Sequence, residues 1–345
     1  MTSLVYHILL ALIPSMVLSL PMLNSNQTDS YNLKLAWETY WVNSGKIDSE
    51  EVILSLPQWT LTQSNKLLHS SRLTRHKRVV FGDDDRVRID PATDGEKFPY
   101  TAIMRVSTGC SGIMVSKSHI LTAAHCVHDG QQYRQSALFF LRAGYLQPDG
   151  TTKWGYVKRF FVPSGWKDLS ESKQHVNKDW DDYDVAILEL ATDMGDERDF
   201  IAPGLSGMFC DGKVITHGAD SKVEYVSFPD DKETNAYWYV QTKIDTESPH
   251  LIYFRGDAWH GSSGAGLYTW DYNEESKKYE RRVVGVLSGN RDAEPIASVQ
   301  GNFNVAARLN PANFLLVCQW IGAEDKCKER YKKYLDNDSS KTLCS

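Results

Sequence analysis

The chain has 345 residues, of which 41% are hydrophobic, so it can bury a substantial core in one large domain or two. Its formal net charge of −6 argues against nucleic acid as the main partner. Six cysteines, an even number, favour an oxidising compartment.

The N-terminal residues have the pattern of a secretory signal. Leu9–Leu20 is a continuous apolar segment interrupted only by proline and small serines, and it is too short to span a bilayer comfortably. Small residues near its end, Val17 and Ser19, indicate cleavage before Leu20. We therefore expect residues 1–19 to be a signal peptide, with an uncleaved anchor as the alternative. The mature protein is then secreted, extracellular and free of the membrane.

Residues 20–78 are polar, contain no cysteine and show little sign of a separate core, although residues 33–37 have a helix-like pattern. They end in the basic quartet Arg75-His76-Lys77-Arg78. Such a quartet is most often a solvated loop or an anion-binding patch. In a secreted chain, however, Arg-x-Lys-Arg matches a proprotein convertase site. We therefore interpret residues 20–78 as a propeptide that a convertase cuts between Arg78 and Val79.

After Val79 the chain consists of short β-like runs separated by turn residues, without a long helical period. This pattern favours an all-β sandwich or barrel over βαβ units. The runs are Ala102–Val106, Ala137–Leu141, Tyr156–Val162, Val185–Leu190, Val214–Thr216, Lys222–Val226, Tyr237–Ile244 and Val283–Leu287.

The segment from Cys110 to Cys126 contains the first candidate catalytic residue. Two short apolar runs flank a polar turn at residues 116–119, which is a hairpin signature. His125 follows the second run, between two alanines and a cysteine. An isolated histidine in an apolar context is usually a hydrogen-bonded core residue. A cysteine that tethers the turn and two further motifs favour catalysis instead.

Those motifs supply an acid and a nucleophile. Asp184 directly precedes a buried run, so it can point inward and accept a hydrogen bond from the far ring N–H of His125. Gly261–Gly266 is rich in glycine and small residues, which let the backbone turn sharply and direct two N–H groups toward one point. Such a segment alone is more often a flexible turn. The order His, Asp, Ser along the chain makes the pattern specific.

The three motifs together resemble those of chymotrypsin-fold serine peptidases. The resemblance implies two antiparallel six-stranded β-barrels with a C-terminal helix, formed by a peptidase domain at residues 79–330. It implies a catalytic triad of His125, Asp184 and Ser263, and an oxyanion hole formed by the N–H groups of Gly261 and Ser263. The expected activity is hydrolysis of protein or peptide substrates by a monomer that needs no metal or other cofactor.

The residues after the predicted cut also resemble this family. Val79-Val80-Phe81-Gly82 resembles the hydrophobic new N-terminus of activated serine peptidases, which implies a zymogen. However, Ser262 stands where trypsin-like enzymes have the aspartate that pairs with the new ammonium, so activation cannot follow the trypsin manner. Residues 79–86 and 161–166 are similar to the glutamyl endopeptidase branch. The serine protease 23-like secreted proteins of animals are the better match, because the similarity to them extends to the basic quartet before Val79 and to residues 302–306.

Substrate preference is less clearly indicated. Asp257 lies six residues before Ser263, the offset at which trypsin-like enzymes keep a pocket carboxylate for arginine or lysine. Its flanking residues do not match that group, so a loop carboxylate is the alternative. Val286 stands where the glutamyl endopeptidase branch has a histidine, which counts against glutamate preference. Ser288 and Gly289 are expected to hydrogen-bond the substrate backbone.

The six cysteines allow three disulfides. Cys110–Cys126 would pin the histidine turn and contribute about 3 kcal/mol by loop entropy. Cys318–Cys327 is indicated by proximity, which leaves Cys210 with Cys344 by elimination. Asn26 and Asn337 are possible N-glycosylation sites. Asp83–Asp85 could bind calcium, but a run of carboxylates is usually solvated, so no metal is expected.

The chain is expected to end in a helix and a tail. Asn310 and Pro311 have the types of an N-cap and first helical position, and Gly322 stands where a helix stops. With Trp320, this segment resembles the terminal helix of the family, which implies docking on the second barrel. Residues 331–345 are charged and read as a tail.

A different class of function remains open. Serine in place of aspartate at residue 262, and the unusual Ala265-Gly266, would also suit a secreted pseudopeptidase. Such a protein would bind a partner through the same cleft. Reaction of Ser263 with a serine-directed phosphonate discriminates between the two hypotheses.

Overall fold

The computed structural model describes residues 30–57, 79–171, 180–194, 198–206, 208–210, 213–215, 221–273, 276–296 and 299–329. The predicted signal peptide, basic quartet and C-terminal tail lie outside these residues, as do Asn26, Asn337 and Cys344. In the described part of the chain, no helix is both long and apolar enough to cross a membrane.

Six antiparallel strands close into the first barrel, and each strand pairs with the next around the ring until β7 returns to β4. In ring order they are β4 (Ile103–Val106), β5 (Cys110–Ser116), β6 (His119–Thr122), β9 (Ala186–Leu190), β8 (Thr152–Pro163) and β7 (Arg142–Leu146). Their apolar side chains are largely buried, as in Ile113 and Leu188, both with no exposed surface.

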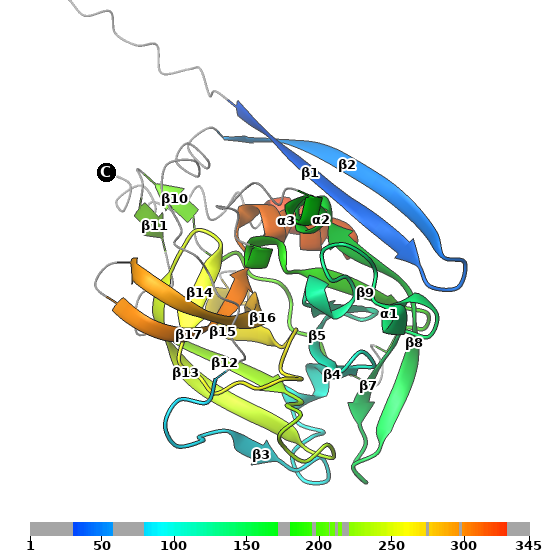
Figure 1. The fold of residues 1–345 in the computed structure, drawn as a ribbon, viewed down its shortest axis with the longest axis vertical. Coiled ribbons are helices and arrows are strands. Elements are labelled where there is room, and N and C mark those ends of the chain that lie inside the picture. Colours follow the sequence, from blue (N-terminus) through cyan, green and yellow to red (C-terminus); the bar gives the residue numbers. More distant parts are fainter. Residues whose placement is uncertain are drawn as a thin grey trace, which may run out of the picture.

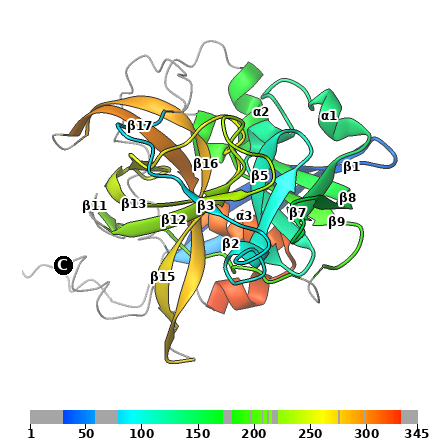
Figure 2. The ribbon, with the colours of Figure 1, turned by 90° about the horizontal axis from the view of Figure 1, so that it is seen from below.

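Six further antiparallel strands close into the second barrel. In ring order they are β12 (Lys222–Ser227), β15 (Gly266–Asn273), β16 (Lys278–Ile296), β17 (Val299–Arg308), β14 (Leu251–Phe254) and β13 (Tyr237–Glu247). The short β3 (Val87–Ile89) adds to the edge of β13, and β10 (Met208–Cys210) pairs with β11 (Lys213–Ile215). Figure 1 shows the two barrels side by side, and Figure 2 shows the outer ends of β15 and β16 projecting from the second. The predicted two-barrel fold is confirmed.

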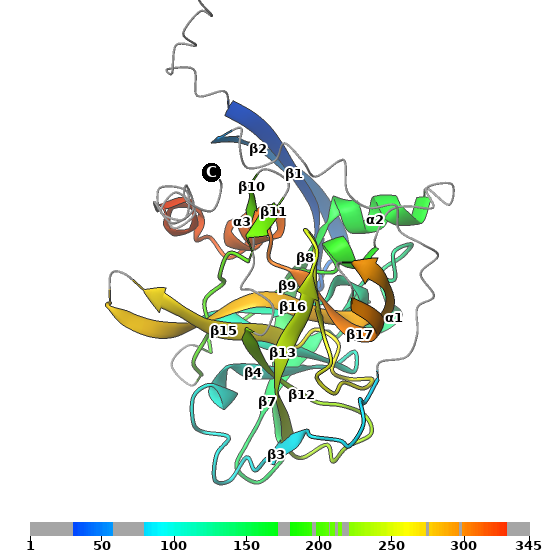
Figure 3. The ribbon, with the colours of Figure 1, turned by 90° about the vertical axis from the view of Figure 1, so that its left-hand side faces the viewer.

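The region predicted to be a propeptide contains a long β-hairpin, β1 (Ser30–Trp41) and β2 (Lys46–Pro57), which extends the sheet of the first barrel. It is the blue ribbon at the edge of the molecule in Figures 1 and 3. The helix-like interpretation of residues 33–37 is therefore wrong. Leu35, Trp37 and Thr39 are buried on one face of β1 and alternate with more exposed residues, which is the period of a strand.

Helical segments are few and short among the described residues. The labelled ones are α1 (Gln135–Leu138), α2 (Ser164–Glu171), α3 (Pro311–Trp320) and the single turns η2 (Tyr100–Ala102), η3 (Ala124–Cys126) and η4 (Trp180–Tyr183). Residues 324–329 are also helical. The predicted strand at Ala137–Leu141 is wrong, because α1 occupies its start. Phe139 and Phe140 that follow are 67% and 76% exposed, so this apolar run does not pack in a sheet.

The C-terminal helix begins and ends as predicted. Asn310 Oδ1 accepts the N–H of Asn313 at 3.0 Å, and Gly322 adopts a positive φ of 66° after the last turn. Its docking differs from the expectation. The Trp320 ring stacks on Phe161 of β8 at 5.9 Å between centroids and meets Trp37 of β1 edge-on at 6.5 Å. The helix therefore packs on the first barrel and the hairpin.

Candidate active site

His125 and Asp184 lie at the ends of two paired strands. β6 leads into η3, which carries His125, while Asp184 lies two residues before the start of β9. Thr122 pairs with Ala186 across the two strands. His125 Nδ1 lies 2.6 Å from Asp184 Oδ2, and the His125 backbone N–H donates to Asp184 Oδ1 at 2.8 Å. The imidazole and its backbone are thus both fixed by one carboxylate.

Ser263 comes from the second barrel and completes the chain of hydrogen bonds. Its Oγ lies 2.6 Å from His125 Nε2. The Ser263 carbonyl also accepts the N–H of Ser111, on β5 of the first barrel, at 2.7 Å. Only 6% of His125 and 4% of Ser263 is exposed, and Asp184 is fully buried. The structure therefore brings the three predicted triad residues together at the junction of the two barrels.

The electrostatic environment keeps Asp184 ionised. Burial alone would raise the pKa of this carboxyl, but the facing His125 ring and the hydrogen bonds from His125 and Ser288 hold its pKa below the ordinary value. A carboxylate can only accept hydrogen bonds. His125 Nδ1 is therefore the donor to Asp184, which leaves Nε2 of a neutral ring to accept the Ser263 hydroxyl proton.

Ser288, which was predicted to contact the substrate backbone, directs its side chain to Asp184. Its Oγ donates to Asp184 Oδ2 across 104 residues of sequence, and only 1% of the residue is exposed. The side chain is thus a third donor to the buried aspartate, a contact that sequence reasoning missed. The neighbouring Gly289 has open space where a Cβ would project. Contact of this strand with a substrate backbone stays a prediction.

The turn before the nucleophile requires glycine at residue 261. Gly261 has a φ of +88°, and a Cβ placed there would lie 2.3 Å from the Phe228 carbonyl oxygen and 2.7 Å from Asp230 Oδ1. Its own carbonyl accepts the Ser111 hydroxyl at 2.8 Å, and the Asp230 N–H donates to the His260 carbonyl at 2.7 Å. Contacts from both barrels therefore hold this turn in place.

Ser262, where trypsin-like enzymes have an aspartate, is fully buried. Its hydroxyl lies 3.0 Å from the Ser227 hydroxyl, and its N–H donates to the Trp259 carbonyl at 3.0 Å. A neutral pair of serines thus occupies the place of an ion pair, so the turn has no buried carboxylate waiting for an ammonium.

The segment that starts at Val79 docks elsewhere on the second barrel. The fully buried Asn304 of β17 accepts the Val79 N–H at 3.3 Å and donates to the Val79 carbonyl at 2.9 Å. The amide also donates to the Gly256 carbonyl at 2.7 Å. Asn304 lies within residues 302–306, which were noted only as a family resemblance, so its anchoring role was missed.

Asp257 serves the same segment, which corrects its interpretation as a pocket carboxylate. Its Oδ1 accepts the Phe81 N–H at 2.6 Å and its Oδ2 accepts the Asp85 N–H at 2.9 Å, while the residue is 2% exposed. Both oxygens are thus engaged by residues 81–85. Burial and the charge of Asp257 raise the pKa of the Asp85 carboxyl.

The aspartate run is not simply solvated, since Asp84 takes part in a charged network. Asp84 pairs with Arg86 at 2.7 Å and Lys232 at 2.6 Å, and Arg86 also pairs with Asp231 at 2.6 Å. The hydrogen bonds from Arg86 outweigh the effect of burial and keep the Asp84 pKa well below its ordinary value. Cations of the protein itself therefore already neutralise Asp84.

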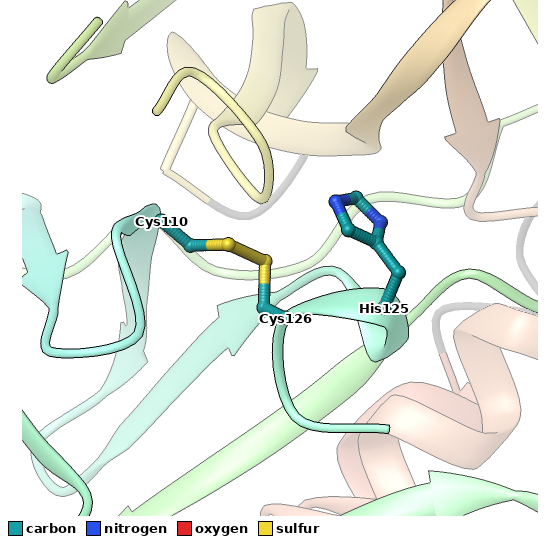
Figure 4. Close-up of side chains that lie close together, drawn as sticks. All are labelled: Cys110, His125 and Cys126. Carbon is teal, nitrogen blue, oxygen red and sulfur yellow. A yellow bond between two sulfur atoms is a disulfide. The ribbon is translucent and has the colours of Figure 1, made fainter. Parts of the chain in front are cut away.

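Both disulfides predicted within the described residues are present, Cys110–Cys126 and Cys318–Cys327. The partner proposed for Cys210, Cys344, lies outside them. The ligand atoms of Cys110, His125 and Cys126 lie within 4.8 Å of one another, the spacing of a metal site. Figure 4 shows that the two sulfurs are joined to each other, so neither is a thiolate that could bind a metal.

Comparison with known proteins is consistent with this geometry. Residues 86–204 match the trypsin family model. Human serine protease 23 is 31% identical over 315 residues, covering 86% of this chain and 78% of the relative. Human inactive serine protease 35 is 26% identical over 360 residues, covering 89% and 82%. A solved structure of a Glu endopeptidase in complex with MPD superposes with a TM-score of 0.51 at 19% identity, covering 71% of this chain and all of that one, which concerns the fold alone.

Proposed function

The chain belongs to the trypsin-like serine protease family, and we propose that it is a secreted serine endopeptidase that is made as a zymogen. The observation that carries this proposal is the unbroken series of short hydrogen bonds from Ser263 Oγ through His125 to the buried Asp184. A binding surface would not need a nucleophile, a base and an orienting carboxylate in this order and geometry.

In the proposed reaction, Ser263 Oγ attacks the scissile carbonyl carbon while His125 Nε2 takes the hydroxyl proton. Asp184 stabilises the imidazolium that results. The N–H groups of Gly261 and Ser263 stabilise the oxyanion, a role in which each donor typically lowers the barrier by about 2.7–4 kcal/mol. The C–N bond then breaks as His125 gives its proton to the leaving amine. Water, activated by the same histidine, releases the acyl group and restores the Ser263 hydroxyl.

The zymogen part of the proposal depends on the basic quartet before Val79. A proprotein convertase would cut after Arg78 and turn the Val79 N–H into an ammonium. Asn304 Oδ1 already accepts from this nitrogen, so the new N-terminus would have an acceptor. Because Ser262 holds the nucleophile turn through neutral hydrogen bonds, the cut would act through Asn304 and Asp257 instead of a buried ion pair.

The alternative is a secreted pseudopeptidase that binds a protein partner through the cleft. Two observations favour it: relatives named inactive serine protease 35 match over most of the chain, and Ser262 replaces the usual activation aspartate. Against it, all three triad side chains are present and hydrogen-bonded.

A fluorophosphonate probe tests the nucleophile directly. Convertase-cut wild type should be labelled on Ser263, and Ser263→Ala should not be labelled. Arg78→Ala, which the convertase cannot cut, should be labelled much more slowly if the protein is a zymogen. Absence of labelling in cut, folded wild type would contradict the peptidase proposal and support the binding alternative.

A further inference from the structure

The hairpin completes an edge that the peptidase domain leaves open. β8 pairs with β7 only along Thr152–Tyr156, while its far half pairs with β1, Trp37–Trp41 against Arg159–Pro163. An additional backbone bond joins the Val42 N–H to the Lys158 carbonyl at 3.1 Å. Without β1, this half of β8 would be an unpaired edge next to the buried Phe160 and Val162, a typical site of aggregation.

Side chains of β1 also form part of the core of the first barrel. Leu35, Trp37, Thr39 and Tyr40 of β1, and Val42 directly after it, are each at most 5% exposed. The Tyr40 ring stacks on Phe160 at 5.1 Å between centroids. Trp37 joins the aromatic cluster of Phe161 and Trp320 described above. The hairpin is therefore packed as an interior element and not as a loosely attached leader.

The hairpin further contacts the loop that follows the catalytic histidine. The Tyr133 ring packs against Tyr40 in a tilted arrangement, 4.9 Å between centroids, and its hydroxyl donates to Glu38 Oε2 at 2.5 Å. Lys167 pairs with the other oxygen of Glu38. Arg134, which follows Tyr133 in the chain, donates to the His125 carbonyl at 2.5 Å. A direct series of contacts thus runs from β1 to the backbone of His125.

We propose that residues 30–57 remain bound to the peptidase domain after the cut before Val79, as a non-covalent second chain that holds the loop at residues 127–134 against His125. The propeptide is then a permanent subunit of the mature protein. This inference rests on the proposed cleavage before Val79. Residues 1–109 contain no cysteine, so no disulfide can join the cut segment to the peptidase domain.

The test uses Ser263→Ala protein in which Arg75–Arg78 is replaced by the recognition sequence of a site-specific protease. After complete cutting, seen by denaturing electrophoresis, the N-terminal fragment should co-elute with the peptidase domain in native size-exclusion chromatography and separate from it in denaturant. A fragment that elutes separately under native conditions would overturn the proposal. Because this protein is inactive by design and cut by an added protease, the result does not depend on the peptidase function.

Matched variants locate the interaction. Trp37→Ala with Tyr40→Ala should reduce the retained fraction about tenfold, since large buried aromatic side chains dominate such interfaces. Ile47→Ala with Ile53→Ala, on β2, should retain the fragment like the parent, because these side chains are 48% and 61% exposed. Thermal melting of each uncut variant checks that it folds. Equal retention in the two pairs would contradict the assigned interface.

Hydrogen exchange tests the second half of the proposal. Amides of residues 127–134 should be protected in the cut complex. They should exchange faster in the cut Trp37→Ala/Tyr40→Ala protein after its released fragment has been separated by size-exclusion chromatography. Unchanged exchange in this loop after fragment release would contradict a role for the hairpin in holding the His125 loop.

Discussion

The side-chain amide of Asn304 binds both backbone polar groups of Val79, 225 residues away in sequence. Because Asn304 is fully buried, its replacement by an apolar residue would leave three backbone groups without this partner, on Val79 and Gly256. We expect Asn304→Leu to lower the free energy of unfolding by about 2 kcal/mol or more. Equilibrium denaturation in urea measures the change.

The same chemical change at an exposed asparagine provides the control. Asn235→Leu should alter the free energy of unfolding by less than about 0.5 kcal/mol, because Asn235 is exposed. Asn304→Leu should also speed hydrogen exchange in residues 79–86. Stability and exchange equal to those of wild type would show that Asn304 does not anchor this segment.

Ser288 should tune the triad through Asp184. Ser288→Ala removes the hydroxyl that donates to Asp184 Oδ2, and hydrogen bonds to charged groups are worth about 1.5–3 kcal/mol. We expect the rate of fluorophosphonate labelling to fall about tenfold or more, with binding of a reversible peptide ligand nearly unchanged. An unchanged labelling rate would mean that His125 suffices to position Asp184.

Gly261 should be indispensable for the nucleophile turn. A Cβ at this residue would overlap the Phe228 carbonyl oxygen, so Gly261→Ala must displace the turn. We expect labelling of Ser263 to fall by at least about a hundredfold, the typical cost of losing one oxyanion donor. Gly322→Ala is the control, because its φ is also positive but nothing lies within 4 Å of a Cβ added there. Equal labelling of the two variants would contradict the role given to the turn.

His128 should make the stability of the first barrel sensitive to acid. Burial lowers the pKa of His128 to about 4, and its Nδ1 accepts the Gly130 N–H at 3.0 Å, which requires a neutral ring. The unfolded state, with a pKa near 6.5, binds a proton that the folded state excludes. Stability therefore falls as the pH drops from about 6.5 to about 4, by up to about 3 kcal/mol.

His128→Asn keeps a side-chain acceptor but cannot titrate, so it should flatten this part of the pH profile. Denaturant unfolding of both proteins at pH 7, 5.5 and 4 provides the measurement. If the two profiles have the same slope, His128 is not the group responsible.

The positions of His125, Asp184 and Ser263 could be predicted because their signals are local, and the two barrels were implied by the resemblance of these motifs to the chymotrypsin-fold family. Each triad residue lies next to an apolar strand or within a glycine-rich turn that is visible in a few residues of sequence. The N-cap Asn310 and the stop at Gly322 are equally local, and α3 has the predicted bounds.

What could not be predicted depends on contacts between distant residues. The two N–H groups that engage Asp257 come from residues more than 170 positions earlier, so its offset from Ser263 alone suggested a pocket. Ser288 likewise meets Asp184 only in the folded barrel. The strand at residues 33–37 contains good helix formers, and pairing with β2 along this whole stretch overrides that preference. The available signal in the sequence was the alternation of the large apolar residues Leu33, Leu35 and Trp37 with smaller or charged ones.

Digestion of a diverse peptide library by the convertase-cut protein tests the central claim most directly. New amino termini, identified by mass spectrometry, should accumulate with wild type and should be absent with Ser263→Ala prepared in the same way. If cut, folded wild type produces no more new termini than Ser263→Ala, the protein is not a peptidase and its cleft serves binding.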